Sequence, residues 1–238
     1  MIPIRGARAT HGWPWMTIGL IAVNVAVFLY QLYIGPKAAN SLFWQKGAVA
    51  AKLSQPHLLT SLQALKLVPT VFISLFLHAN WLHLLGNMWF LWVFGEGLED
   101  DLGHWRFLAF YICCGLFACI FHVWAAWKLT APMIWASGAI AGVLGGYLRR
   151  LPRSSITTAV FWRLKLETHE YPAVIWLALW VALQFYGLRQ GGAVAWMAHL
   201  GGFLMGLLTV NLFTTVGRGD VKGKAAGKKS APAKKKRR

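Results

Sequence analysis

Charged side chains are scarce in this sequence, and acidic ones are the rarest. Only 13% of the 238 residues are charged, with 7 Asp and Glu against 24 Lys and Arg. Soluble domains carry about 25% charged residues, so this shortage excludes an ordinary soluble globular protein. Hydrophobic residues make up 57% of the chain and include 14 Trp, a residue that prefers membrane–water interfaces. The composition predicts a polytopic membrane protein with one membrane domain.

Metal-binding and redox motifs are also missing. The three cysteines lie in one apolar stretch between residues 113 and 119, without a CxxC spacing, so we interpret them as packing residues. No HExxH motif occurs, and we expect neither a metal ion nor an organic cofactor. Metal coordination by His78, His83 and His199 is the alternative.

Six apolar segments are each long enough, at about 20 residues, to cross a bilayer. They predict an all-α fold, a bundle of six transmembrane helices within a membrane domain over residues 13–216. The connection 35–79 is semi-apolar and is expected to lie in the membrane interface as short amphipathic helices. The six segments are 13–34, 80–97, 105–127, 132–149, 172–189 and 194–215.

Basic residues predict the orientation of these segments. Placing residues 1–12 inside puts most Lys and Arg on the cytoplasmic side, so we expect a multi-pass cell-membrane protein with both termini cytoplasmic. Ten of the 24 Lys and Arg lie in the tail 217–238. We predict that this low-complexity tail is disordered and binds anionic lipid. Nucleic-acid binding is not expected, because no folded nucleic-acid module accompanies the tail.

Two polar residues inside apolar segments carry the functional signal. Ser137 lies in PMIWASGAIAGVLGGYL and His199 in VAWMAHLGGFLMGLL, where a nucleophilic or ionisable group is costly unless it has a function. The imidazole of His199 can act as the base that activates the Ser137 hydroxyl. Neither segment contains Asp or Glu, so the pair would be a dyad rather than a triad. Taken alone, Ser137 would more often hydrogen-bond to its own helix.

A third segment offers donors for an oxyanion. His83 and Asn87 are four residues apart, hence on one helical face, and the backbone N–H of Ser137 near a helix start is a further donor. In the predicted topology these groups and His199 lie about one to two turns below the outer boundary. The alternative for His83 and Asn87 is interhelical hydrogen bonding. His78 is expected in the preceding loop, supporting the site.

Small residues recur every four positions in the segments that carry the dyad. Gly138, Gly142 and Gly146 follow Ser137, and Gly202 and Gly206 follow His199. Such small-xxx-small faces let helix backbones approach closely. We therefore expect segments four and six to pack together and to bring Ser137 within hydrogen-bonding distance of His199.

The sequence resembles the rhomboid intramembrane serine proteases from about Leu75 to Leu208. HANWLHLLGNMWFLWVFGEGLEDDLGHWRFLAFY, ASGAIAGVLGGYL and AHLGGFLMG look like that family's second-span, serine and histidine motifs, in the expected order. The resemblance implies a six-helix rhomboid-like bundle, with Ser137 as nucleophile and His199 as general base. It also implies an oxyanion hole of His83, Asn87 and the Ser137 amide, and Gly202 and Gly206 as a packing face.

The motifs depart from the family pattern beside the nucleophile. The serine motif usually reads G-x-S-G, but Trp135 replaces the first glycine, and a large ring there could narrow the substrate cleft. Some members place an aromatic residue four positions after the serine to stack on the histidine. That position is Ala141 here, so something else must orient His199.

The leading hypothesis is a serine endopeptidase that cleaves transmembrane segments of membrane proteins. A non-catalytic rhomboid-like protein that binds membrane clients is the main alternative, although a binder needs neither Ser137 nor His199. A small transporter is a third, but no internal repeat or pair of broken spans supports it.

Overall fold

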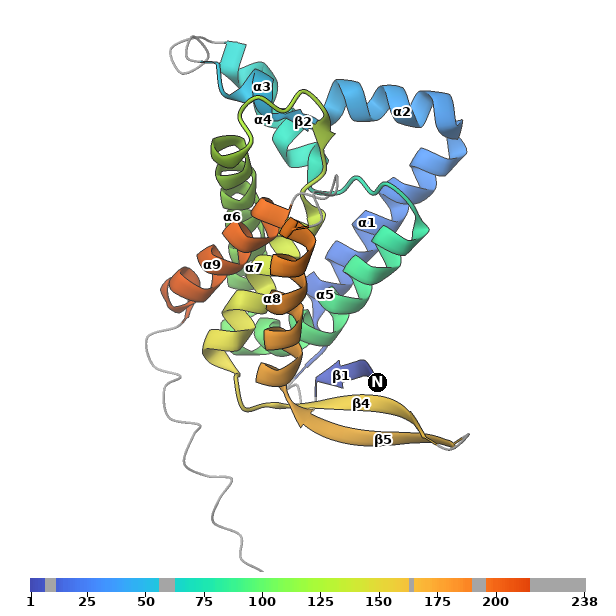
Figure 1. The fold of residues 1–238 in the computed structure, drawn as a ribbon, viewed down its shortest axis with the longest axis vertical. Coiled ribbons are helices and arrows are strands. Elements are labelled where there is room, and N and C mark those ends of the chain that lie inside the picture. Colours follow the sequence, from blue (N-terminus) through green and yellow to red (C-terminus); the bar gives the residue numbers. More distant parts are fainter. Residues whose placement is uncertain (7–11, 56–62, 163–164, 190–195, 215–238) are drawn as a thin grey trace, which may run out of the picture.

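The computed structural model describes residues 1–6, 12–55, 63–162, 165–189 and 196–214. Most of the described residues are helical. The short helices α2–α4 lie at one end of the bundle, and a small sheet lies at the other (Figure 1). The helices are α1 (Trp15–Tyr33), α2 (Gly35–Lys46), α3 (Ala50–Leu53), α4 (Gln63–Ser74), α5 (Trp81–Leu102), α6 (His104–Ala125), α7 (Ala136–Arg150), α8 (Ala173–Arg189) and α9 (Trp196–Thr209), followed by the 3-10 turn η2 (Val210–Phe213).

Each of the six predicted apolar segments overlaps one of the helices α1 and α5–α9, and α5 extends five residues beyond its predicted end at residue 97. Within the described residues, three stretches are long and apolar enough to cross a membrane: Trp15–Tyr33, His104–Ala125 and Trp196–Phe213. The other three helices are shorter or carry charged residues at one end, so the count of six crossings stays a prediction. The described part of the connection 35–79 contains the short helices α2–α4, as expected, and its place in the membrane interface stays a prediction.

Local signals define where α5 begins and ends. The side chain of Asn80 caps its first turn, because its Oδ1 accepts a hydrogen bond from the His83 backbone N–H at 2.9 Å. Gly103 ends the helix with φ at +85°, a conformation that residues with a Cβ rarely adopt, and α6 starts at the next residue.

Helix α7 lies at the centre of the bundle and is buried almost throughout (Figure 1). It packs against α9, α6 and α5. A Cβ at Gly202 would overlap the carbonyl oxygen of Gly138, and one at Gly206 would overlap that of Gly142. The predicted close packing of these two segments is therefore present. Gly146 is different, because it faces the Phe110 ring of α6 rather than α9.

The all-α expectation is wrong at the end opposite α2–α4. Strands β4 (Ser155–Trp162) and β5 (Lys165–Pro172) form an antiparallel hairpin, and β1 (Ile2–Gly6) pairs with β4 (Figure 1). Strand β4 is rich in β-branched and aromatic residues, which favour extended backbone. Two further short strands, β2 (Ala48–Val49) and β3 (Pro132–Met133), pair near the other end. Residues 2–6 are thus part of the fold, whereas the tail 217–238 lies outside the described residues.

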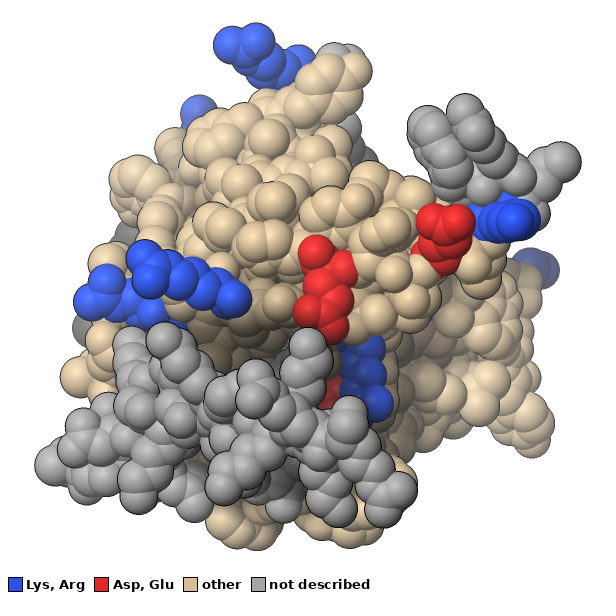
Figure 2. All heavy atoms as spheres, turned by 90° about the horizontal axis from the view of Figure 1, so that it is seen from below, with Lys and Arg blue, Asp and Glu red and all other residues tan. Residues whose placement is uncertain are grey.

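Charged side chains gather at the sheet end of the molecule, where acidic and basic groups share one face (Figure 2). Ion pairs between arginine and acidic side chains join different elements there. Arg150 lies 2.6 Å from Asp101, and Arg5 lies 3.4 Å from Glu96. The four acidic residues of α5 therefore lie at the same end as β1, as the predicted topology requires.

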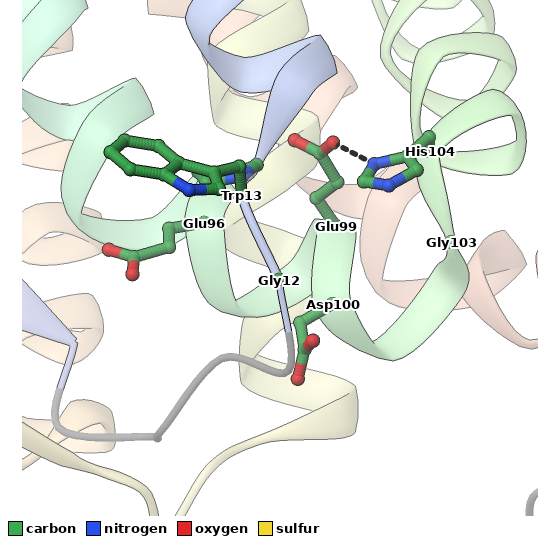
Figure 3. Close-up of a pocket in the computed structure, with 8 residues that line it drawn as sticks. Gly12, Trp13, Glu96, Glu99, Asp100, Gly103 and His104 are labelled. Atoms are coloured by element: carbon green, nitrogen blue, oxygen red, sulfur yellow. Dashed lines mark hydrogen bonds and ion pairs between the residues drawn. The ribbon is translucent and has the colours of Figure 1, made fainter.

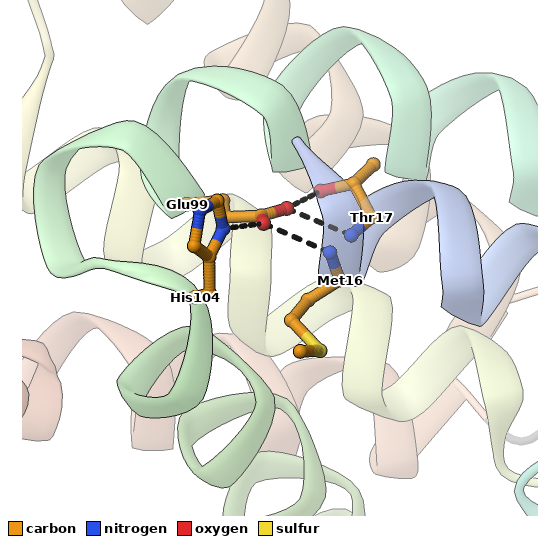
Figure 4. Close-up of polar contacts among 4 residues, drawn as sticks. All are labelled: Met16, Thr17, Glu99 and His104. Atoms are coloured by element: carbon orange, nitrogen blue, oxygen red, sulfur yellow. Dashed lines mark hydrogen bonds and ion pairs between the residues drawn. The ribbon is translucent and has the colours of Figure 1, made fainter. Parts of the chain in front are cut away.

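A buried carboxylate fixes the start of α1 at this end. Glu99 is 1% exposed and accepts hydrogen bonds from the backbone N–H groups of Met16 and Thr17, from the Thr17 hydroxyl, and from His104 Nδ1 (Figure 4). Helix starts have unsatisfied N–H groups and a partial positive charge, so an anion stabilises them. A pocket of about 310 Å³ lies beside the contact between Glu99 and the start of α1, and its lining includes Glu96, Glu99, Asp100 and His104 (Figure 3). Because the Glu99 carboxylate is used to cap α1, we interpret this pocket as a structural feature of that contact rather than as a ligand site.

Candidate active site

The predicted nucleophile and the predicted base lie within hydrogen-bonding distance. His199 Nε2 is 2.8 Å from Ser137 Oγ, although the two residues are 62 positions apart. Ser137 is the second residue of α7, and His199 is the fourth of α9. The glycine contacts between these helices allow this distance, because a larger side chain at Gly202 would push the backbones apart.

The backbone at Ser137 suits the binding of an anion. The first N–H groups of an α-helix have no acceptor within the helix, and they lie at its positive end. In α7 the N–H groups of Gly138 and Ala139 both donate to the Trp135 carbonyl. The Ser137 N–H belongs to the same first turn, where a helix leaves N–H groups without acceptors of its own, and it lies beside the hydroxyl that would attack a substrate carbonyl.

The opposite edge of the His199 ring has a partner that the sequence analysis did not identify. His199 Nδ1 lies 2.7 Å from Gln184 Oε1, and both side chains are buried. Gln184 Nε2 donates to the Trp180 carbonyl at 3.0 Å. A signal was present in the sequence: Gln184 is an amide within the apolar segment 172–189, and such residues are costly in a membrane unless they are paired.

His83 and Asn87 lie on the same wall of the site, as predicted. Both line a cavity that also exposes Ser137 and His199. The Asn87 amide nitrogen is 3.0 Å from His78 Nε2, so one of its two N–H groups donates to His78 and the second is not used by this bond.

His78 lies in the loop before α5 and is fully buried. Its ring supports Asn87 by accepting the hydrogen bond of the Asn87 amide. Its backbone N–H and carbonyl are both bonded to the Gln31 side chain of α1, at 3.2 and 3.0 Å. The His78 and His83 ring centroids are 5.2 Å apart. Gln31 is a second contributor that the sequence analysis missed, because it lies 47 residues from its partner.

The cavity has a volume of about 570 Å³ and lies between α5, α7, α8 and α9. Its polar lining residues are His83, Asn87, Ser137, Gln184 and His199, while the rest of its wall is apolar or aromatic. A cavity with this lining suits an apolar peptide whose position is set by a small number of hydrogen bonds. The apolar and small lining residues are Leu82, Gly86, Phe90, Ile140, Trp180, Leu183, Tyr186, Gly187 and Trp196.

Trp135 does not narrow this cavity, contrary to the expectation from its place beside the nucleophile. Its side chain is fully buried and packs edge-on against His122 of α6, with ring centroids 5.0 Å apart. Its backbone N–H donates to the Ser74 carbonyl at 2.9 Å. The indole turns into the core because α6 and α4 enclose it there, and it anchors the segment that leads into α7.

Comparisons with known proteins relate this chain to one family. A family model described as Rhomboid domain matches residues 66–215. The chain is 31% identical over 205 residues to Rhomboid protein 1, mitochondrial, of Saccharomyces cerevisiae, covering 81% of this chain and 51% of that protein. It is 28% identical over 224 residues to Rhomboid protease AarA of Providencia stuartii, covering 85% and 73%. RHOMBOID-like protein 4 of Arabidopsis thaliana is 28% identical over 224 residues, covering 86% and 54%. The chain thus spans about half the length of the yeast and plant proteins.

Proposed function

The chain belongs to the rhomboid family. We propose that it is an intramembrane serine endopeptidase, and that it cleaves the transmembrane segments of other membrane proteins. One observation carries the proposal: the 2.8 Å contact between Ser137 Oγ and His199 Nε2, inside a largely apolar cavity. A hydroxyl bonded to an imidazole acceptor is the arrangement that activates serine.

The steps follow from the positions of these groups. His199 Nε2 takes the proton of Ser137 as Oγ attacks the peptide carbonyl, and the carbonyl oxygen becomes an oxyanion. The Ser137 N–H, His83 and Asn87 act as its donors. His199 then gives the proton to the leaving amine, and an acyl-enzyme remains on Oγ. Water activated by His199 hydrolyses this ester and restores the serine.

The substrate must present an extended segment to this site. A peptide bond within an intact helix is shielded by its own hydrogen bonds and by neighbouring side chains. Segments that contain Gly or Pro unwind at lower cost, so they are the favoured class of substrate. The apolar cavity wall supports a substrate whose side chains come from a bilayer.

We also propose a topology for the chain: it crosses the cell membrane six times, and both of its termini are cytoplasmic. Charged groups gather at the sheet end, and the dyad lies on the N-terminal halves of α7 and α9. Basic side chains favour the cytoplasmic face, which places the sheet inside and the cavity toward the outer side. The basic tail would then contact anionic lipid of the inner leaflet.

A membrane client binder is the second candidate function. The same apolar cavity would suit a client binder, but binding an apolar helix does not require a serine bonded to a histidine. The 2.8 Å contact therefore favours the protease.

Labelling with a fluorophosphonate probe tests the proposal. The purified protein is compared with Ser137→Ala and His199→Ala, and with the control variants Ser41→Ala and His169→Ala, whose side chains are exposed away from the cavity. We expect labelling of the wild type and both controls, and none of the two site variants. Cleavage of a Gly-containing transmembrane peptide should follow the same pattern. A folded wild type that neither labels nor cleaves would support the client binder instead.

A further inference from the structure

The imidazole of His199 is held from its far edge by a neutral amide. In carboxylate-containing triads, the acid accepts the Nδ1–H, which selects the tautomer that leaves Nε2 free as a base, and it also stabilises the imidazolium. Here Gln184 Oε1 occupies the acceptor position, at 2.7 Å from Nδ1. Ala141, one turn after Ser137, has no ring that could stack on His199.

The orientation of the Gln184 amide follows from its second contact. Its nitrogen donates to the Trp180 carbonyl of the preceding turn at 3.0 Å. A flipped amide would bring its oxygen against that carbonyl and would leave two acceptors facing each other. Oε1 is therefore directed at His199, and the Nδ1–H tautomer is the one that matches it. Gln184 is only 4% exposed, so this bond is largely shielded from solvent.

Helix packing keeps α8 close enough to α9 for this bond. A Cβ at Gly187 would overlap the Trp196 ring, so the absence of a side chain there lets α8 approach the start of α9. The Trp196 ring is edge-on to His199, with centroids 5.6 Å apart. Trp180 lies on another side of the imidazole, at 6.1 Å. The ring is thus enclosed, and its one strong directional contact on the Nδ1 side is with Gln184.

We propose that Gln184 is the positioning residue of the catalytic histidine, so that the working unit is Ser137–His199–Gln184, with an amide in the place of a carboxylate. The inference rests on the proposed function, since it assigns a role within that reaction. Gln184 selects the tautomer and fixes the ring plane. It carries no charge, and although it also lines the cavity, the role proposed for it is to hold the imidazole rather than to bind substrate.

Removal of the acceptor should slow the reaction without weakening substrate binding. General-base catalysis contributes about 10²- to 10⁴-fold, and a histidine with the wrong tautomer or orientation loses part of it. Gln184→Met keeps the length and flexibility of the side chain but removes the acceptor oxygen. We expect it to lower kcat and the rate of fluorophosphonate labelling by about 10- to 100-fold, with KM unchanged.

Gln184→Glu tests whether the acceptor itself is responsible, because it keeps an oxygen at the same position. It should recover part of the lost rate, because its second oxygen faces the Trp180 carbonyl in place of the N–H that Gln184 donates there. Phe185→Leu is the matched control: it lies next along α8, is 57% exposed and should behave as wild type. Equal losses in Gln184→Met and Gln184→Glu would overturn the proposal, and so would wild-type kinetics of Gln184→Met.

A measurement on the unaltered site keeps the proposal testable even if Gln184→Met does not fold. A buried, hydrogen-bonded imidazole N–H gives a low-field proton resonance, which is assigned to His199 by its absence in His199→Ala. We expect this resonance in the wild type and in Gln184→Glu, and an Nε2–H tautomer in the wild type would refute the assignment. Failure of the proposed function would be seen separately, as a folded wild type that does not label.

Discussion

Adding one methyl group at Gly202 should move Ser137 and His199 apart. In Gly202→Ala the new Cβ would lie 3.0 Å from the carbonyl carbon of Gly138 and would overlap the carbonyl oxygen. Carbon atoms in contact are normally about 3.5–4.0 Å apart. Helices α7 and α9 must therefore move apart by roughly 1 Å, because both sides of the contact are backbone and neither can rotate away.

The consequence for the site follows from its geometry. Ser137 and His199 are 2.8 Å apart, and a shift of about 1 Å takes them out of hydrogen-bonding range. A misplacement of this size can cost about 100-fold in rate. Overpacking of this kind also destabilises a protein by about 1–3 kcal/mol. We expect a folded but less stable protein with a labelling rate about 100-fold lower.

The assay combines the fluorophosphonate labelling rate with thermal unfolding in the same detergent. The control is Gly19→Ala in α1, where no neighbouring atom lies within 4 Å of the added Cβ. It should label like wild type and be more stable by about 0.5–1 kcal/mol, since Ala is favoured over Gly within a helix. Wild-type labelling by Gly202→Ala would refute the reasoning, because it would mean that the close helix contact does not hold the dyad together.

Three other changes test contacts outside the dyad, each by thermal unfolding and labelling. Gln31→Leu removes the side-chain partners of the His78 backbone N–H and carbonyl, so we expect the free energy of unfolding to fall by about 1–3 kcal/mol and labelling to be slower. Unchanged labelling would mean that the loop of His78 does not support the proposed oxyanion donors. Trp135→Gly should destabilise the protein by about 3–5 kcal/mol through the cavity it leaves, and faster cleavage would contradict its assignment to the core. Glu99→Gln should cost about 1–3 kcal/mol, because the start of α1 loses its anion; an unchanged melting temperature would argue against that cap.

The apolar segments and the motif residues can be identified from the sequence alone. Hydrophobic length and helical periodicity are local properties, so the positions of α1 and α5–α9 were predicted to within a few residues. The same periodicity placed Ser137 and His199 on facing helices and put glycines at the contact between them. Long-range pairing of extended segments is not local, and the three-stranded sheet was missed for that reason. Strand β1 pairs with a strand about 150 residues later in the chain.

The sequence by itself determined which residues could do chemistry in this protein, because nucleophiles and imidazoles are rare in apolar segments and each must be paired or used. Only the tertiary structure decided which partners they have. Gln184 rather than an aromatic ring holds His199, Gln31 holds the loop of His78, and Trp135 turns into the core instead of the cavity. These choices depend on which helices touch and how closely. A buried polar group accepts whichever donor or acceptor the packing brings within about 3 Å, and no local pattern of residues encodes that distance.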